Sequence, residues 1–322
     1  MNTSKLEIFP NEIFFEIFDY LSIQELYKSF YNLNNCLTTI LMSYTNIPTT
    51  IASNQSINFF AINFFSSRIT RLSINYHYSI DLSSFQSLRS IKILDKPNRF
   101  QKYSLKNLTN LELICIVHNT QWNNNCLIQL SDDIMTNSFP NLRLCQIGQV
   151  IDNQQYHWQI LPLLRSLTIC TKDVNIYSKI LYFCPYLNRL KLILDVLTKS
   201  LSFESSPHLF LHKLEICLAL HSISICEILN FLLSPLSNLT HLIIHGPHQY
   251  PKQLNINLLG PILHKHVPKL IQFYFQMAID NTLALQLIQN NYIAISRIHP
   301  LFIHIKVNQR QRQTPAKVII SS

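Results

Sequence analysis

One apolar phrase recurs along most of the chain. Its clearest copy is Leu187–Leu192, which reads Leu-x-x-Leu-x-Leu and follows Cys184-Pro185-Tyr186. Side chains alternate between two faces along a strand, so the fourth and sixth positions of the phrase share one face. Each copy therefore predicts a short strand with one apolar face. Ten copies are present, and they begin at Ile69, Leu88, Leu111, Leu142, Leu164, Leu187, Leu211, Leu239, Leu270 and Ile298.

The segments between copies leave room for the chain to return to the start of the next strand. Successive copies begin 19 to 31 residues apart. Several of the intervening segments show helical spacing, as at Ile176 and Ile180, and Ser224 with Glu227 predicts a capping box for a helix that follows it. A single unit cannot bury its own apolar face, so neighbouring units must stack and share a core.

The phrase and its spacing resemble the leucine-rich repeat, whose period is about 20 to 29 residues. The subtype with Cys-Pro before the phrase, as at Cys184-Pro185, is similar to the one found in F-box proteins. The resemblance implies an α/β solenoid, with a curved parallel sheet and outer helices, over residues 57–305.

The first 46 residues have a different pattern, which predicts three helices. Apolar residues recur at helical spacing after Pro10, and Pro10 itself suits a first helical turn. Ser22 and Glu25 predict a capping box for a second helix, and a third is expected over 35–43. We expect a three-helix domain at 1–46, a linker at 47–56 and a loosely ordered basic tail at 306–322. The first helical stripe comprises Ile13, Phe14, Ile17, Phe18 and Leu21, and the second comprises Leu26, Phe30 and Leu33.

This segment resembles an F-box over roughly residues 6–41. Phe9 stands where the family pattern begins with Leu, Phe30 takes the place of a later Val, and the Trp that ends the pattern has no counterpart. The matching residues are Pro10, Glu12, Ile13, Ile17, Phe18, Tyr20, Leu21, Glu25 and Leu26.

An F-box followed by leucine-rich repeats implies a substrate-recruiting receptor of an SCF-type ubiquitin ligase, acting in ubiquitin-dependent protein degradation. Such a subunit is not an enzyme and needs no cofactor; it binds the SCF adaptor and, through it, the cullin scaffold. The alternative is that the apolar residues only form the core of the three helices. The residues expected to contact the adaptor are Phe9, Pro10, Ile13, Ile17, Leu21 and Leu26.

Charge is unevenly distributed. The chain has 26 Lys and Arg against 17 Asp and Glu, a net charge of +9, but residues 1–48 carry −3 and the remainder +12. The repeats therefore favour an acidic partner, unless the charge serves only solubility. Side chains at the third, fifth and seventh positions of each phrase face away from the core and are expected to bind the substrate protein. They include Arg71, Lys92, Gln146, Arg189, Lys191, Lys213, His241 and Tyr274.

The alternative function is a leucine-rich-repeat scaffold that binds an acidic protein or RNA without a link to ubiquitin. A basic run over 89–106 would suit RNA, but no recognition motif accompanies it, so we do not expect nucleic acid to be the partner.

Several other classes of chemistry are not expected. Three glycines in 322 residues cannot build a phosphate-cradling loop. The eight cysteines include no C-x-x-C pair, which favours reduced, buried thiols. His241 and His245 would lie about 13 Å apart on a strand, too far to share a metal, so no metal site is expected. Without a signal sequence or an uncharged apolar span, the chain is expected in the cytoplasm or nucleus and not in a membrane.

Overall fold

The computed structural model describes residues 8–51, 59–74, 82–94, 105, 108–116, 125–150, 158–173, 175–194, 207–218, 225–246, 256–279, 304–308 and 316–321. The chain divides into two compact units. The first comprises residues 1–126 with 138–142, and the second comprises residues 127–137 with 143–322.

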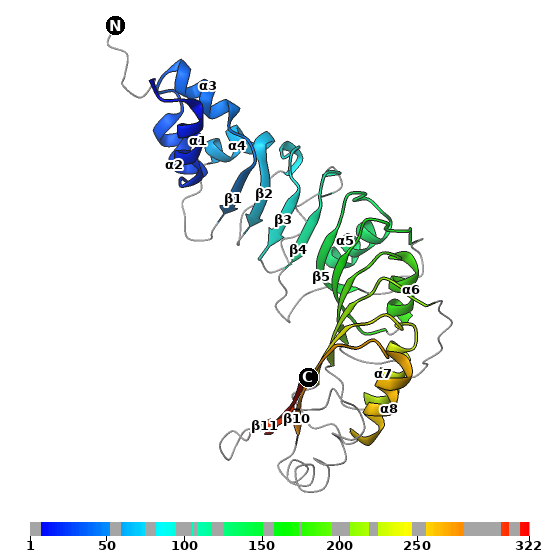
Figure 1. The fold of residues 1–322 in the computed structure, drawn as a ribbon. Helices are drawn as coiled ribbons and strands as arrows, with labels where there is room; N and C mark the ends of the chain where they lie inside the picture. Colours follow the sequence, from blue (N-terminus) through cyan, green and yellow to red (C-terminus); the bar gives the residue numbers. More distant parts are fainter. Residues whose placement is uncertain are drawn as a thin grey trace. The chain divides into compact units, whose positions relative to one another are not determined.

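The first unit begins with the three helices that the sequence predicts (Figure 1). They are α1 (Asn11–Asp19), α2 (Ile23–Phe30) and α3 (Asn35–Ser43). The predicted capping box of α2 is present: the Glu25 N–H donates to Ser22 Oγ at 3.3 Å, and the Ser22 N–H donates to Glu25 Oε2 at 2.8 Å. The buried residues shared by the three helices include Phe14, Phe18, Leu26, Leu37 and Leu41.

Four parallel strands follow among the described residues of this unit. They are β1 (Ile47–Ile51), β2 (Ile69–Ile74), β3 (Ser90–Ile93) and β4 (Leu113–Ile116), paired in that order. Helix α4 (Phe59–Phe65) and the short 3-10 segments η2 (Ser66–Arg68) and η3 (Leu82–Ser84) lie between them in sequence. The predicted linker at 47–56 is therefore wrong for residues 47–51, because these pair with β2 and bury Ile47.

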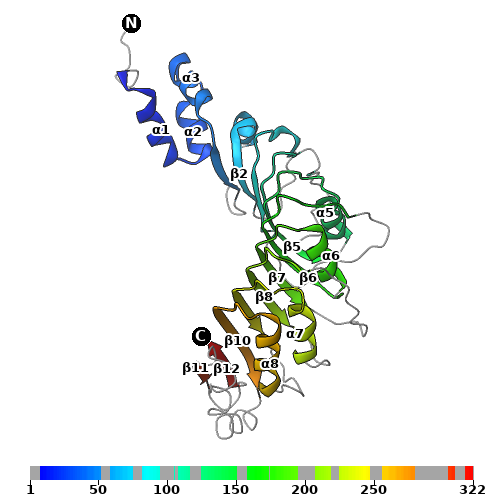
Figure 2. The same cartoon turned by 45° about the vertical axis from the view of Figure 1, so that its right-hand side comes forward.

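In the second unit, the described residues form six parallel strands. They are β5 (Leu144–Val150), β6 (Ser166–Thr171), β7 (Arg189–Leu194), β8 (Lys213–Leu218), β9 (His241–His245) and β10 (Gln272–Ile279), each paired with the next. Four described helices precede or connect these strands: α5 (Asn125–Met135), α6 (Asn175–Phe183), α7 (Ile225–Leu233) and α8 (Ile256–His266). Figures 1 and 2 show α6, α7 and α8 along one side of this sheet.

Beyond β10 the sheet of the second unit departs from the repeat. Strand β12 (Ala316–Ser321) pairs antiparallel with β10, and β11 (His304–Asn308) pairs antiparallel with β12. The prediction of a loosely ordered tail at 306–322 is thus wrong for the strand residues. The tenth phrase, which begins at Ile298, lies outside the described residues.

The core of the second unit confirms the alternation that the phrase predicts. Along β6, β7 and β8 buried residues alternate with partly exposed ones. The fourth position of each phrase forms one continuous buried row across neighbouring strands. This row is Leu167, Leu190, Leu214, Leu242 and Phe273. The architecture is therefore α/β, with parallel strands that repeat along the sequence and helices against the sheet.

Asparagine side chains join successive repeats. In three repeats the residue before the phrase is Asn, and its Nδ2 donates to a backbone carbonyl of the preceding repeat. The pairs are Asn110 to Gln86 at 3.1 Å, Asn141 to Thr109 at 3.1 Å and Asn238 to Leu209 at 3.0 Å. In each pair the acceptor lies two residues before its own phrase, so the contact recurs at the same position.

Within the described ranges, none of the helices combines the length and apolarity that crossing a bilayer requires.

Candidate functional site

The first candidate surface is on α1, which is apolar on two sides. Phe14 and Phe18 point into the helical core and are each 1% exposed. Ile13 and Ile17 are one helical turn apart on another side of the helix and remain accessible, and the exposed Phe9 and Tyr20 flank the helix just before and just after it. We call these the outer face of α1: Phe9 (51% exposed), Ile13 (39%), Ile17 (41%) and Tyr20 (89%).

Acidic residues border the outer face, and a hydrogen bond ties the end of α1 to Tyr44. Glu12 and Glu16 are exposed on α1 beside Ile13 and Ile17. Asp19, at the end of the helix, accepts a hydrogen bond from the Tyr44 hydroxyl after α3. Burial, followed by the bond to Asp19, holds the pKa of Tyr44 well above its ordinary value, so the hydroxyl remains a donor. This hydrogen bond joins the end of α1 to the residue that follows α3.

The six residues predicted to contact the adaptor differ in their exposure to solvent. Phe9, Pro10, Ile13 and Ile17 are exposed, and Leu21 is half-buried. Leu26 is fully buried in the core of the trio, so its predicted place at the adaptor surface is wrong. Tyr20 shares the outer face, although sequence reasoning used it only as a motif match.

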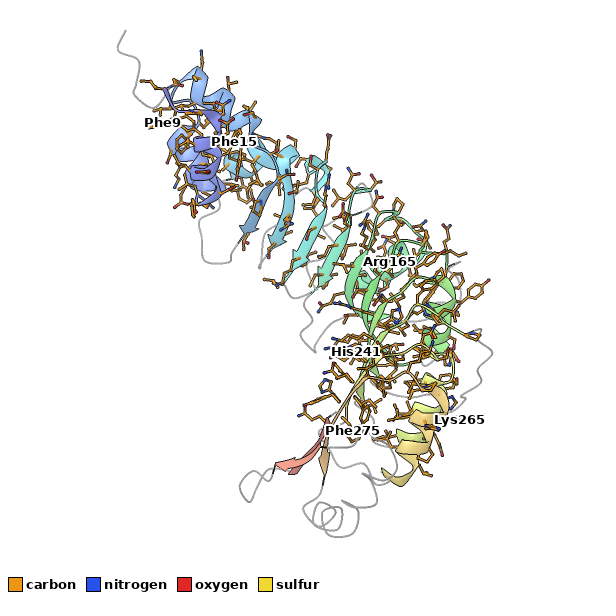
Figure 3. All side chains as sticks on the ribbon, in the orientation of Figure 1. Phe9, Phe15, Arg165, His241, Lys265 and Phe275 are labelled. Atoms are coloured by element: carbon orange, nitrogen blue, oxygen red, sulfur yellow. The ribbon has the colours of Figure 1, made fainter. Side chains whose placement is uncertain are left out.

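The second candidate surface is the side of the second unit's sheet that carries the third, fifth and seventh positions of the phrases. We call it the open sheet face. Figure 3 shows His241 on this side of the sheet and Lys265 of α8 on the other. Parallel pairing aligns Arg189, Lys213, His241 and Gln272 in one row.

The predicted substrate residues fall into two groups. Gln146, Arg189, Lys191, Lys213, His241 and Tyr274 lie on the open sheet face of the second unit. Arg71 and Lys92 occupy the equivalent strand positions in the first unit, where both are exposed.

The middle of the open sheet face holds a network of charged and polar groups. Lys191 Nζ lies 2.5 Å from Glu215 Oε1, and His245 Nε2 lies 3.7 Å from the same oxygen. The hydrogen bond with Glu215 raises the pKa of Lys191 and outweighs the opposing effect of burial. The Tyr274 ring is 5.8 Å from that of His245, and its hydroxyl donates to Gln276 Oε1 at 3.0 Å.

Cys217 adjoins this network on β8. Its side chain is half-buried, and burial raises the pKa of the thiol. One donor atom from each of Glu215, Cys217 and His245 lies within 4.8 Å of the others. Sequence reasoning examined His241 and His245 along one strand, whereas this group joins His245 to residues of the neighbouring strand.

A third feature is an exposed aromatic patch at the turns that precede the strands of the second unit. The rings of Tyr186 and Phe210 lie 5.1 Å apart. The Arg165 guanidinium lies 5.1 Å from the Tyr186 ring and donates to the Tyr186 carbonyl at 3.1 Å. Leu163, at the same position of the preceding repeat, is also exposed. The sequence analysis did not predict this patch. The signal for it was an apolar residue directly before the phrase, where three other repeats have Asn.

The first unit also has a polar hollow of about 400 Å³, whose lining includes Arg68, Arg89 and Glu112. Its charged groups already contact protein atoms. Arg89 Nη1 lies 3.6 Å from Glu112 Oε1. Arg68 donates to the backbone carbonyls of Leu41 and Phe64. The hollow therefore offers less unpaired charge to a ligand than its composition indicates.

The outer face of α1 is apolar with an acidic border, whereas the open sheet face is polar and mostly basic. No protein-family model and no curated protein matches this sequence. The chemistry of these surfaces is therefore the guide to function.

Proposed function

We propose that this chain is the non-catalytic substrate receptor of an SCF-type ubiquitin ligase, built as an F-box helical trio followed by a leucine-rich-repeat solenoid. The observation that carries the proposal is the second apolar side of α1. Phe14 and Phe18 already supply the helical core, so Ile13 and Ile17 are not needed there. Clustered exposed apolar side chains mark interaction surfaces, and these two stand at positions that resemble the F-box pattern.

The outer face of α1 suits an apolar groove on the adaptor. Ile13 and Ile17 are one helical turn apart, as in helices that insert one face into a groove. Complete burial of the exposed part of each side chain contributes roughly 1 kcal/mol. Glu12 and Glu16 favour a groove with a basic border, because complementary charge speeds encounter and fixes orientation.

The open sheet face is the proposed substrate surface. Arg189, Lys213 and His241 lie on adjacent strands, whose spacing in a sheet is about 4.8 Å. This row favours an acidic segment of the substrate protein, while Tyr274 supplies an aromatic contact of the kind enriched in interface hot spots. The adaptor would bind a different surface, the outer face of α1, and the cullin would be recruited through the adaptor.

The test is co-purification of the full chain with the SCF adaptor. The variant is Ile13→Asp with Ile17→Asp, and the matched control is Met42→Asp, which alters another exposed apolar residue on α3. We expect the wild type and the control to capture the adaptor and the double variant to lose at least 100-fold in affinity. Circular dichroism verifies that all three are folded.

Two results would count against the proposal. Undiminished capture by the double variant would remove α1 from the contact. A folded wild type that does not capture the adaptor would reject the F-box assignment.

The basic row supports a second candidate function, a leucine-rich-repeat scaffold for an acidic protein or RNA without a ubiquitin link. Binding to RNA should then weaken steeply with added salt, because phosphate contacts release counterions. Lys213→Glu should reduce such binding, and adaptor capture should be absent.

A further inference from the structure

We propose that Glu215, Cys217 and His245 form a three-ligand Zn²⁺ site on the open sheet face. Zinc binding would be a property additional to the proposed receptor function, and it does not depend on that function. A chain that fails to bind the SCF adaptor could still bind zinc, and the reverse also holds.

Strand register brings the three side chains together. Glu215 and Cys217 are two residues apart on β8, so both point to the same side of the sheet. Cys217 is the direct partner of His245 in the parallel pairing of β8 with β9. Both occupy the seventh position of their phrases, and the repeat therefore places a thiol beside an imidazole.

The donor set matches zinc. Thiolate sulfur, imidazole nitrogen and carboxylate oxygen are the usual Zn²⁺ ligands, with bonds of about 2.0 to 2.3 Å. Tetrahedral angles then require donors about 3.3 to 3.8 Å apart. The three donors lie within 4.8 Å of one another, so a shift of about 1 Å would close the site. All three side chains are half-buried rather than fixed in the core, which permits that adjustment.

Mixed sulfur and nitrogen donors also select among metals. Mg²⁺ and Ca²⁺ prefer oxygen donors, whereas thiolate and imidazole suit zinc. Three protein ligands leave the fourth position of a tetrahedral ion for water, because the open sheet face is accessible to solvent. Binding converts the Cys217 thiol to thiolate and releases its proton to solvent.

Lys191 is the main competitor for the site. Its ammonium lies 2.5 Å from Glu215 Oε1, the carboxylate that the ion would use. Zinc must therefore displace Lys191 or share Glu215 with it, and the nearby positive charge opposes a second cation. Removal of this ammonium should tighten zinc binding.

The experiment uses the full chain in two measurements. Zn²⁺ affinity is measured by competition with a chromophoric chelator, and Co²⁺ is added as a spectroscopic substitute. We expect one equivalent of Co²⁺ to give a thiolate-to-cobalt charge-transfer band with the visible bands of tetrahedral cobalt. Cys217→Ser should abolish the charge-transfer band, and Glu215→Gln and His245→Asn should each weaken Zn²⁺ binding at least tenfold.

Two matched controls separate this site from other thiols and imidazoles. Cys170 lies in the same cross-strand row as Cys217, on β6, and His241 lies on the same strand as His245. Cys170→Ser and His241→Asn should bind as the wild type does, and Lys191→Met should bind several-fold more tightly. The proposal is overturned by a wild type without the cobalt band, by a Cys217→Ser variant that keeps it, or by weaker binding in Lys191→Met.

Discussion

The imidazole of His208 donates from Nε2 to the backbone carbonyl of Cys184, 24 residues earlier, at 3.0 Å. Its Nδ1 accepts from the Leu211 N–H at 3.2 Å, which assigns the proton to Nε2 in the neutral ring. The His208 N–H donates to the Pro235 carbonyl at 2.8 Å. One buried histidine thus joins three successive repeats.

His208 should make stability dependent on pH. Burial lowers the pKa of the ring below its ordinary 6.5, although the Cys184 carbonyl partly opposes this effect. The unfolded chain therefore gains its proton first as pH falls, and stability that is present above pH 6.5 is lost progressively below it. Chemical denaturation of the second unit should show a smaller fall from pH 7.5 to 5 in His208→Gln than in the wild type. An identical fall in both proteins would exclude His208 as the group responsible.

Asp132 should have the opposite pH dependence. It is buried on α5, and among the described residues its Oδ2 has no hydrogen-bond partner. Burial, with the neighbouring Asp133, raises the pKa of this carboxyl from 3.8 to about 6. The folded state therefore retains a proton that the unfolded chain has lost, and stability falls as pH rises from about 4 through 6.

The corresponding substitution is Asp132→Asn, which cannot ionise. We expect a higher melting temperature than the wild type at pH 8 and a smaller difference at pH 4. Asp133→Asn, which alters the less buried neighbour, should have a weaker effect. A melting difference for Asp132→Asn that is the same at both pH values would show that ionisation of Asp132 is not its cause.

The repeated strands could be predicted because the signal for them is local. In the copy that begins at Leu211, the buried positions Leu214 and Ile216 were evident from alternation alone, and β8 covers them. By contrast, β1 has no copy of the phrase, and only its pairing with β2 makes it a strand. The antiparallel strand β12 was missed for the same reason: it depends on β10, far away in sequence.

The candidate surfaces show the same limit. Helical spacing predicted that Ile13 and Ile17 share a side of α1, but it could not show that Leu26 is buried in the core of the three helices. The group around Cys217 depends on register between strands. A usable signal existed, because Cys217 and His245 occupy the same position of successive phrases. Comparison of equivalent positions across repeats, rather than spacing along one strand, would have revealed it.

The hydroxyl of Tyr177 should contribute to stability at the end of a neighbouring helix. Tyr177 is fully buried on α6 and donates to the Leu232 carbonyl of α7 at 2.6 Å. The last carbonyls of a helix have no partner within it. Tyr177→Phe should therefore lower the free energy of unfolding by roughly 1 to 3 kcal/mol, the cost of a buried group left without its bond. Tyr182→Phe, on an exposed side of the same helix, is the control and should change little.

Arg68 should stabilise the first unit by joining α3 to α4. Its Nη1 donates to the Leu41 carbonyl at 2.6 Å and its Nη2 to the Phe64 carbonyl at 2.9 Å, while the guanidinium lies over the rings of Phe64 and Phe65. Lysine retains the charge but cannot present two nitrogens in a planar fork. Loss of one charge-assisted bond costs about 1.5 to 3 kcal/mol.

We therefore expect Arg68→Lys to increase hydrogen–deuterium exchange in α3 and α4 without affecting α6 and α7 of the second unit. Exchange measured by mass spectrometry suits this test better than a single melting curve, because two compact units need not unfold together. Arg71→Lys provides the control, since Arg71 is exposed on the following strand and should leave exchange unchanged. Equal exchange in Arg68→Lys and the wild type would show that the carbonyl contacts do not hold α3 in place.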